Sequence, residues 1–301
     1  MLHIWVVLFS LLTLHSPLLS SDESELLEKV VRGVMKKVSK TPLDVAKYPT
    51  GLGEKLQDFE RTVVSKLHEL KTVGAKIAGI VGVGGVGKTT LAKHFFNLKR
   101  SDYDASSFLF DVRENARTRS INYVQSKLID ELKHTDIKIE SRDQGIGELR
   151  KHISSCHALI ILDDIDNIDQ MEALLPMKDI LNPRSLILVT SRDKHVLRSS
   201  RVLDSSIYIL KGLNRLDSEE LLCSYVFYQR RPLPGFADLV YLFVIACDGL
   251  PLSLKVFGAL VCQRKQSYWN DFMKGFPLKY RTISTSVMSH SKKRIKKYSL
   301  I

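Results

Sequence analysis

The chain has 301 residues, of which 44% are hydrophobic, 26% charged and 8% aromatic. A chain of this length and composition can bury a core of its own, which excludes disordered, collagen-like and disulfide-scaffold proteins. Its net charge of +12 would suit a nucleic-acid or membrane partner, but no acidic residue follows Asp271, whereas eight basic residues do. The excess charge therefore belongs mainly to the C-terminal end, and the rest of the chain is close to balanced.

Residues 1–21 form an apolar leader. Met1 to Ser20 carry no formal charge and resemble the hydrophobic region of a signal peptide or a short membrane anchor. No Lys or Arg precedes the run, no small-residue cleavage site follows it, and polar residues between Thr13 and Pro17 shorten it below the ~20 residues that span a bilayer. An anchor, a signal peptide and a leader without a targeting role all remain open. We expect a cytoplasmic protein. If the leader inserts in a membrane, the basic residues that follow it favour the alternative of a membrane-anchored protein that faces the cytosol.

Residues 22–47 are expected to form a helical linker. Asp22 and Glu25 have the spacing of a capping box, and apolar residues from Leu26 to Val38 recur at helical spacing. A second helix is predicted from Glu54 to Leu70.

Residues 48–214 are predicted to form an α/β domain. Short apolar runs, with helical patterns between most of them, occur at Ile77–Val83, Phe108–Val112, Leu159–Leu162, Leu186–Val189 and Ile207–Leu210. Such runs are typical of buried parallel strands.

Residues 215–275 contain no further strand pattern and are predicted to form a small all-helical subdomain. Its helices are expected over Ser218–Tyr228, Ala237–Cys247, Pro251–Val261 and Tyr268–Phe272. The predicted fold is thus an α/β parallel sheet with flanking helices, followed by this subdomain and by a basic tail at 276–301.

The four cysteines lie far apart and include no C-x-x-C pair. This usage is typical of a reducing compartment and gives neither a disulfide framework nor a zinc ribbon. His152, Cys156 and His157 come closest to a metal-ligand cluster, but a second pair of ligands is missing. We expect the cysteines to be small buried hydrophobes.

A phosphate-binding loop follows the first apolar strand. It matches G-x-x-x-x-G-K-[ST] over eight consecutive residues: Gly82, Val83, Gly84, Gly85, Val86, Gly87, Lys88 and Thr89. A helix opens directly behind it at Thr90, so backbone N–H groups and the helix dipole would face a phosphate. Lys88 is expected to bridge the β- and γ-phosphates, and the Thr89 hydroxyl to bind Mg²⁺. The motif predicts a P-loop nucleotide site.

A carboxylate pair ends another apolar strand. Leu159–Leu162 is followed by Asp163 and Asp164, the Walker B pattern, in which the first acid serves the Mg²⁺ shell. Asp163 and Thr89 are therefore the predicted metal residues, and Asp164 is the candidate catalytic residue that orients an attacking water. The next apolar strand ends in Thr190, Ser191 and Arg192, and this arginine is either a γ-phosphate sensor or a surface residue.

The ordered motifs resemble the NB-ARC domain of plant disease-resistance nucleotide-binding proteins. The resemblance rests on the P-loop together with the segments Phe108–Asn115, Leu162–Asp166, Thr190–Arg192 and Gly249–Leu252, the last being the GLPL motif. Asp166 and the stretch Phe108–Asn115 are similar to the subgroup whose full members carry an N-terminal TIR domain. Ser191 departs mildly from the usual Thr-Thr-Arg.

The resemblance implies a role for individual residues. Gly82, Gly84, Gly85, Val86, Gly87, Lys88, Thr89 and Thr90 would hold the phosphates, and Arg192 would sense the γ-phosphate, since the family places its strand between the P-loop and Walker B strands. Pro251 would lie against adenine, with Thr50 and Gly51 on the far side of the base. The implied ligands are ADP or ATP with Mg²⁺, and the implied role is a defence-signalling switch with slow hydrolysis at most.

The same resemblance leads us to expect a truncated member. The sequence contains no TIR domain, no winged-helix unit with its MHD motif and no leucine-rich repeats, which the full members have. The expected partners besides adenine nucleotide are a second copy or related resistance proteins, with a membrane as a further option through residues 1–20. The alternative function is an interaction or adaptor protein that pairs with full-length relatives and in which nucleotide binding is vestigial. A third interpretation makes the basic run Lys292–Lys297 a nucleic-acid site, although we expect no specific nucleic acid.

Overall fold

The structure is a computed structural model that describes residues 41–69 and 73–274. The elements discussed below belong to the compact unit that begins at Leu43. The predictions for the apolar leader, for most of the helical linker and for the basic tail lie outside the described residues.

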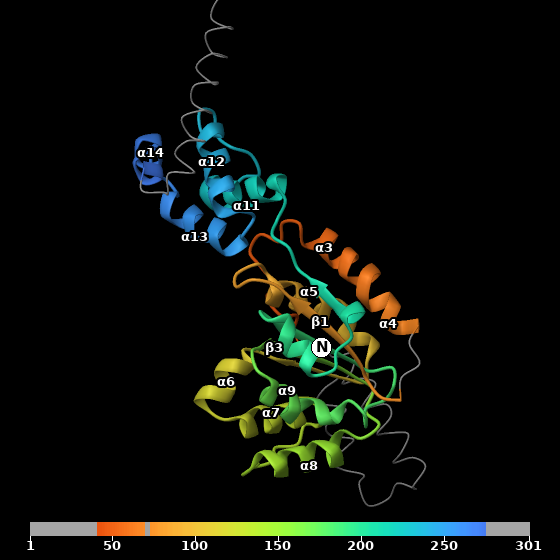
Figure 1. Ribbon diagram of the computed structural model, residues 1–301. Helices are drawn as coiled ribbons and strands as arrows, with labels where there is room; N and C mark the ends of the chain where they lie inside the picture. Colours follow the sequence, from red (N-terminus) through yellow and green to blue (C-terminus); the bar gives the residue numbers. More distant parts are fainter. Residues whose placement is uncertain (1–40, 70–72, 275–301) are drawn as a thin grey trace, which may run out of the picture. The chain divides into compact units, whose positions relative to one another are not determined.

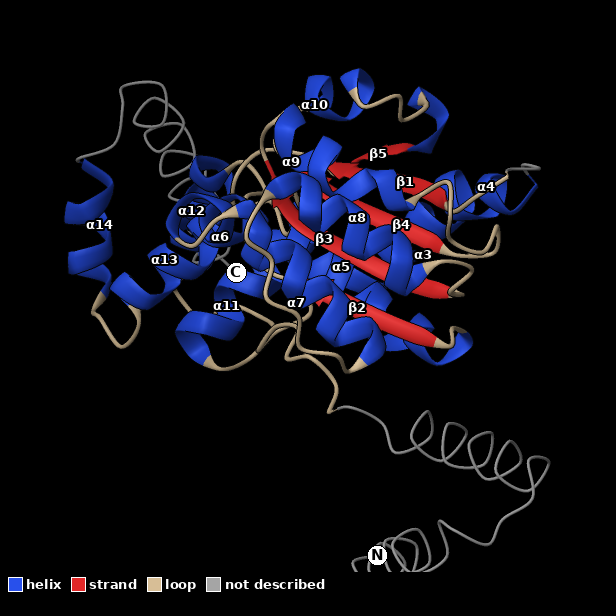
Figure 2. Cartoon of the chain, turned by 90° about the horizontal axis from the view of Figure 1, so that it is seen from below, coloured by secondary structure: helices blue, strands red, loops and turns tan. Residues whose placement is uncertain are grey.

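A parallel sheet forms the centre of the α/β part, as predicted (Figures 1 and 2). In the described chain it has five strands in the order β2-β3-β4-β1-β5, and every neighbouring pair is parallel. Their bounds are β1 (Lys76–Val81), β2 (Ala105–Leu109), β3 (Ala158–Ile165), β4 (Leu186–Ser191) and β5 (Ile207–Ile209). β4 lies between β1 and β3, so the segments after these three strands meet at one edge of the sheet.

Alternate residues of the central strands enter two separate cores. In β3, Leu159 and Ile161 pack into one core, while Ile160 and Leu162 pack into the other. All four side chains are fully buried, which is why the strand has no polar face.

Helices cover both faces of the sheet. One core receives α3 (Leu52–Phe59), a π-helical turn (Glu60–Val64), α4 (Ser65–Glu69) and α5 (Lys88–Lys99). The other receives α6 (Val112–Thr118), α7 (Ile121–Lys133), α8 (Arg142–Ile153), α9 (Ile168–Leu174) and α10 (Lys194–Ser199). Three short 3₁₀ turns complete this part at Arg100–Asp102, Leu175–Met177 and Asp204–Ser206.

Several helices begin at a residue whose side chain accepts a hydrogen bond from a backbone N–H of the first turn. Ser120, Ser141 and Asn167 accept from the backbone N–H three residues later, at the starts of α7, α8 and α9. Each bond satisfies a donor that the helix itself leaves unpaired.

The predicted bounds of β1, β4 and β5 are wrong by one or two residues, and those of the second and third strands need larger corrections. The second strand was expected at Phe108–Val112 but runs over Ala105–Leu109, because Ser107 is buried and donates to Glu131 at 2.8 Å. The third was expected to end at Leu162 but continues to Ile165, since hydroxyl groups satisfy the buried carboxylate that follows Leu162.

A helical subdomain follows the sheet, as predicted. It consists of α11 (Arg215–Phe227), α12 (Ala237–Cys247), α13 (Pro251–Val261) and α14 (Gln266–Lys274). Its own core centres on Trp269, whose indole N–H donates to the carbonyl oxygen of Val261 at 3.1 Å. Rings of Phe227, Phe236 and Phe243 lie 5.1 to 5.9 Å from the Trp269 ring, centroid to centroid. The subdomain thus has a core separate from those of the sheet.

Two glycines of α8 provide a matched pair of substitutions. A Cβ on Gly145 would collide with Oε1 of Gln125, a buried side chain whose amide donates to the carbonyl oxygens of Arg142 and Ala173. A Cβ on Gly147 would meet no atom within 4 Å. Because alanine favours a helix, Gly147→Ala should raise the free energy of unfolding by about 0.5–1 kcal/mol. Gly145→Ala should lower it by about 1–3 kcal/mol through overpacking. Urea unfolding measures both changes, and equal stabilities would contradict the packing of α7 on α8.

Across residues 41–69 and 73–274, no helix is both long and apolar enough to cross a membrane. The predicted membrane contact of residues 1–20 lies outside this range.

Candidate functional site

The P-loop connects β1 to α5 and depends on its glycines. Gly85 and Gly87 have φ of 78° and 103°, values that side chains other than glycine rarely adopt. A Cβ on Gly82 would lie 2.8 Å from the carbonyl oxygen of Leu210, just after β5. The loop can therefore follow this path only with glycine at these positions.

Lys88 is held inside the loop that precedes it. Its side chain is buried, and its ammonium group donates to the carbonyl oxygens of Gly82 at 2.8 Å and Val83 at 3.1 Å. Burial lowers the pKa of Lys88, and the neighbouring Arg192 adds to this effect. A bound anion would stabilise the charged Lys88 ammonium group against both burial and the nearby Arg192 charge. The residues of the loop therefore fit a phosphate.

Thr89 and Asp163 face each other at the start of α5. The Thr89 hydroxyl lies 2.9 and 3.1 Å from the two carboxylate oxygens of Asp163, and the Thr190 hydroxyl donates to the same carboxylate at 2.7 Å. Asp163 is 1% exposed, and burial raises its pKa, while the two hydroxyl groups act in the opposite direction. Within the described residues this buried carboxylate has no ion pair, so the hydroxyl and carboxylate oxygens suit a hard divalent cation.

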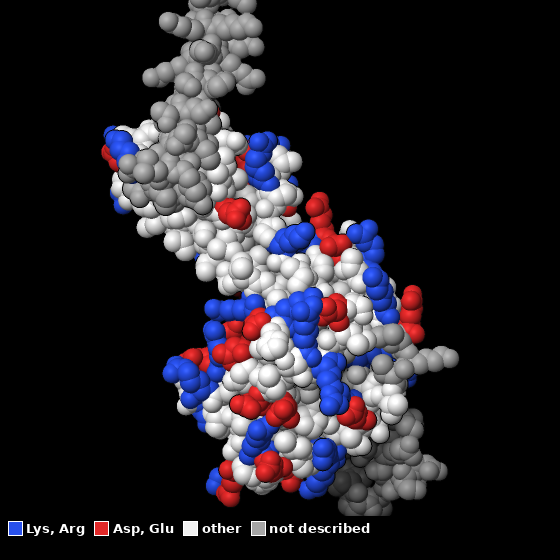
Figure 3. All heavy atoms as spheres, in the orientation of Figure 1, with Lys and Arg blue, Asp and Glu red and all other residues white. Residues whose placement is uncertain are grey.

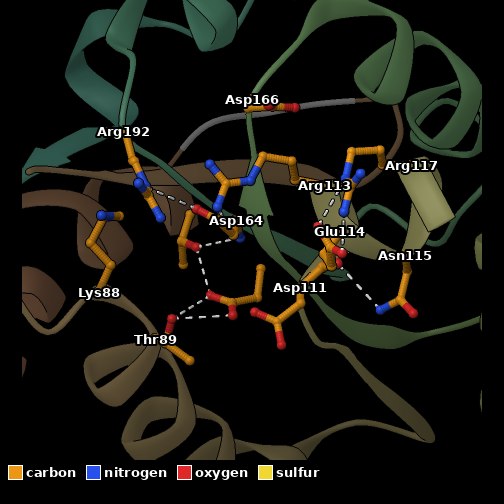
Figure 4. Close-up of polar contacts among 12 residues, drawn as sticks. Lys88, Thr89, Asp111, Arg113, Glu114, Asn115, Arg117, Asp164, Asp166 and Arg192 are labelled. Carbon is orange, nitrogen blue, oxygen red and sulfur yellow. Dashed lines mark hydrogen bonds and ion pairs between the residues drawn. The ribbon is translucent and has the colours of Figure 1, made fainter. Parts of the chain in front are cut away.

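Asp164 lies between two arginines (Figure 4). Its Oδ2 is 2.8 Å from Arg113 Nη2, and its Oδ1 is 3.4 Å from Arg192 Nε. The Asp164 backbone has φ of 57°, and its N–H donates to the Thr190 hydroxyl at 2.9 Å. The register of β3 against β4 shifts between Leu162 and Ile165, so both aspartates lie at an irregularity of the strand.

Arg192 follows β4, the strand between the P-loop strand β1 and the Walker B strand β3, as the family resemblance implied. Its guanidinium group lies over Gly84, where a Cβ would be 3.5 Å from Arg192 Nη1. The structure therefore brings Arg192 to the P-loop.

A cavity of about 570 Å³ joins these groups to the helical subdomain. This volume lies within the range of small-molecule sites. The predicted site residues that line it are Thr50, Gly84, Gly85, Val86, Gly87, Lys88, Thr89, Thr90, Asp164, Arg192 and Pro251. Three predicted residues are outside the lining: Gly82, Asp163 and Gly51. Gly82 accepts from the lining residue Lys88, and Asp163 accepts from the lining residue Thr89. Gly51 precedes the first residue of α3, and a Cβ on it would lie 2.6 Å from Asp217 Oδ2.

The helical subdomain contacts the P-loop directly. The Leu252 N–H, in the first turn of α13, donates to the carbonyl oxygen of Gly85 at 3.2 Å. The Leu213 N–H donates to the carbonyl oxygen of Gly249 at 2.7 Å, which fixes the GLPL segment beside the chain that leaves β5. Pro251 is thereby held in the cavity wall.

Some residues at this site were not predicted. Arg113, Tyr48 and Tyr225 belong to segments that resemble the family, but no site role was expected for them or for Lys55. Tyr48, Lys55 and Tyr225 line the cavity. Tyr48 and Tyr225 contact edge to face, with ring centroids 4.9 Å apart. Lys55 donates to the carbonyl oxygens of Lys211 and Gly212 at 2.8 and 3.0 Å. The only available signal was their closeness in sequence to recognised motifs.

Comparison with known proteins identifies the family. The family model described as "NB-ARC domain" matches residues 56–231, more than half of the chain. The chain belongs to the NB-ARC family. It is 30% identical to disease resistance protein RUN1 of Vitis rotundifolia over 260 residues, which cover 86% of this chain and 19% of that protein.

Other NB-ARC relatives give the same result. TMV resistance protein N of Nicotiana glutinosa is 31% identical over 256 residues, 83% of this chain and 21% of that protein. The chain thus spans about a fifth of the length of the curated relatives it matches. These relatives agree with the TIR-type subgroup predicted from Asp166 and the stretch Phe108–Asn115.

Among solved structures, the chain is similar to Cdc6p from Pyrobaculum aerophilum, with a TM-score of 0.49 and 14% identity over 73% of this chain and 64% of that chain. The Aeropyrum pernix Orc1 protein, solved in complex with DNA, has a TM-score of 0.48 and 15% identity over 83% of this chain and 74% of that chain.

Gly85→Ala is expected to weaken nucleotide binding at least about tenfold, because the positive φ costs about 1–3 kcal/mol in alanine. In addition, the new Cβ would lie 2.7 Å from Leu252 Cβ and push α13 away. Gly53→Ala is the control, since a Cβ there meets no atom within 4 Å. Fluorescence titration with labelled ADP compares the two variants, and equal affinities would contradict the described path of the loop.

Proposed function

We propose that the chain is an adenine-nucleotide-binding signalling module of the plant disease-resistance type, with ADP or ATP and Mg²⁺ bound in the cavity. The observation that carries the proposal is the shared cavity. Lys88, Thr89 and Arg192 line it together with Thr50 and Pro251 from outside the P-loop. Phosphate-binding and base-binding walls of this kind are what a nucleotide needs.

The chain's own groups would bind the phosphates and the metal. The Lys88 ammonium group would donate to phosphate oxygens in place of the carbonyl oxygens of Gly82 and Val83. Backbone N–H groups at the start of α5 would donate to the same anion. Thr89 would ligate Mg²⁺ directly and Asp163 through water, while Thr190 keeps the Asp163 carboxylate in place. The bound metal would neutralise part of the phosphate charge.

Hydrolysis would be slow at most. Asp164 is the candidate for orienting an attacking water. Both of its carboxylate oxygens already contact guanidinium groups, Arg113 at 2.8 Å and Arg192 at 3.4 Å. A carboxylate in this environment is poorly available to a water molecule, which favours a binding switch over rapid turnover.

The proposed switch uses the contact between α13 and the P-loop. Leu252 donates to Gly85, so a change at the phosphates would reach the helical subdomain through one hydrogen bond and through Pro251 beside the base. Ligand-dependent repositioning of the subdomain would then be the signal.

Pairing with a second copy or with related resistance proteins is a further part of the proposal. Leu252, Val256 and Leu260 recur every four residues along α13 and are 51%, 47% and 46% exposed. An apolar stripe of this kind favours protein contact, which is also the basis of the alternative adaptor function. On the face drawn in Figure 3, basic and acidic side chains of the described residues are interspersed. The nucleic-acid interpretation concerns Lys292–Lys297, which lie outside the described residues.

Thermal unfolding of the full chain tests the proposed ligand. ADP with Mg²⁺ at about a hundredfold excess over its Kd should stabilise the chain by about 2.7 kcal/mol. GDP and UDP at the same concentration should stabilise it less. A midpoint that moves with none of these nucleotides, or equally with all three, would contradict an adenine-nucleotide site.

A further inference from the structure

The two ion pairs of Asp164 are unequal. Arg113 Nη2 lies 2.8 Å from Oδ2, and the side chains of this pair are 36% and 17% exposed. Arg192 Nε lies 3.4 Å from Oδ1, and the Arg192 side chain is 53% exposed. The shorter and less exposed contact is the stronger one. Asp164 is therefore held mainly by Arg113, and Arg192 only loosely.

Asp164 has little freedom to leave this position. Its N–H donates to Thr190 Oγ1, which itself donates to the buried carboxylate of Asp163. Its backbone is left-handed at the point where the register of β3 shifts. The carboxylate is thus fixed at the cavity wall, and its charge has to be balanced there.

Arg113 reaches the site from a different element. It lies in the first turn of α6, after a left-handed residue, Asp111, and a turn that Asn115 closes by donating to the carbonyl oxygen of Phe110 at 2.8 Å. Asp164 and Arg192 line the cavity, whereas Arg113 does not. Figure 4 shows the Arg113 guanidinium group directed at Asp164. Arg113 therefore acts on the cavity through Asp164.

We propose that Arg113 is a positioning residue for triphosphate selectivity: it neutralises Asp164, so that Arg192 can release this carboxylate and bind a third phosphate. This inference rests on the proposed function. Without Arg113, Asp164 would keep a full negative charge beside the phosphates and would hold Arg192 as its remaining arginine contact among the described residues. Both effects weaken binding of a triphosphate more than binding of a diphosphate.

The first test compares two nucleotides in the full chain by isothermal titration, with ADP and a non-hydrolysable ATP analogue as ligands. Arg113→Gln should lower the affinity for the ATP analogue about tenfold relative to ADP. Arg117→Gln is the matched control, because Arg117 lies on the same helix and pairs with Glu114 at 2.7 Å. In Arg117→Gln, the ratio of the affinity for the ATP analogue to that for ADP should equal the wild-type ratio. Arg113→Lys keeps the positive charge beside Asp164, so its preference for the ATP analogue over ADP should be close to that of the wild type.

A double-mutant cycle separates a positioning role from direct phosphate contact or a structural defect. Adding Asp164→Asn to Arg113→Gln removes the charge that Arg113 is proposed to neutralise. The double variant should then match Asp164→Asn alone within about twofold. A loss that persists in the double variant, an equal loss for both nucleotides, or an unchanged ratio in Arg113→Gln would each overturn the inference while leaving nucleotide binding intact. A wild-type chain that binds neither nucleotide would instead overturn the proposed function, and this inference with it.

Discussion

Lys88→Ala is expected to lower the affinity of the chain for ADP by about a hundredfold, which corresponds to about 2.7 kcal/mol. The reason is that the Lys88 ammonium group is buried in the loop, where the carbonyl oxygens of Gly82 and Val83 hold it in position for a phosphate. Charge-assisted hydrogen bonds in such surroundings contribute about 1.5–3 kcal/mol each. Isothermal titration with ADP and Mg²⁺ measures the change.

Lys99→Ala is the control for this substitution. Lys99 ends the same helix, α5, and pairs with Glu60 at 2.8 Å, with its side chain 38% exposed. Removing it takes away one positive charge and no contact to the cavity. ADP affinity should therefore change by less than about twofold. If the two lysine variants bound ADP equally well, Lys88 would have no special part in phosphate binding.

Trp269→Ala is expected to lower the free energy of unfolding by about 3–5 kcal/mol. Trp269 is the largest fully buried side chain of the described residues, and it contacts the rings of Phe227, Phe236 and Phe243. The substitution leaves a cavity and removes the donor for the Val261 carbonyl oxygen. Urea unfolding followed by circular dichroism measures the loss.

The neighbouring Tyr268 provides the control in the helical subdomain. Tyr268 is 40% exposed and stacks at the edge of the same aromatic group, with its ring centroid 6.5 Å from that of Phe272. Tyr268→Ala should cost less than about 1.5 kcal/mol. A Trp269→Ala chain as stable as Tyr268→Ala would mean that the helical subdomain does not depend on this core.

The sheet and the P-loop could be predicted because their signals are local. Consecutive aliphatic residues such as Leu159–Leu162 are stable only where both faces are buried, and the loop needs glycine at fixed positions. The strand order also agreed with the expectation that brought Arg192 beside the P-loop. The strands and the loop follow from residues that are close together in the sequence, whereas the strand order was implied only by the family resemblance.

The ion-pair arrangement around Asp164 could not be predicted from the sequence. It depends on a left-handed backbone at Asp164, on the Thr190 hydroxyl of the neighbouring strand, which accepts from the Asp164 N–H, and on α6 turning Arg113 toward β3. The two contacts, to Thr190 and to Arg113, join segments at least 26 residues apart. The same reason applies to Leu252, whose N–H donates directly to the carbonyl oxygen of the distant Gly85. Pairings between distant segments leave no periodic pattern in the chain.

The position of Gly51 illustrates a related limit. The resemblance placed Thr50 and Gly51 together beside the base, but only Thr50 lines the cavity. Gly51 is left-handed at the start of α3 and leaves room for Asp217 of α11. A glycine in a recognised motif can thus serve the packing of two helices while its neighbour serves the site, and sequence alone does not separate the two roles.

Identification of the nucleotide that accompanies the purified full chain tests the central claim most directly. The folded protein is denatured, and the released small molecules are separated by chromatography against ADP, ATP, GDP and UDP standards, with Lys88→Ala treated in parallel. We predict a near-stoichiometric adenine nucleotide from the wild type and none from the variant. A folded wild-type chain that releases no adenine nucleotide, and takes up none when incubated with ADP or ATP and Mg²⁺, would contradict the account.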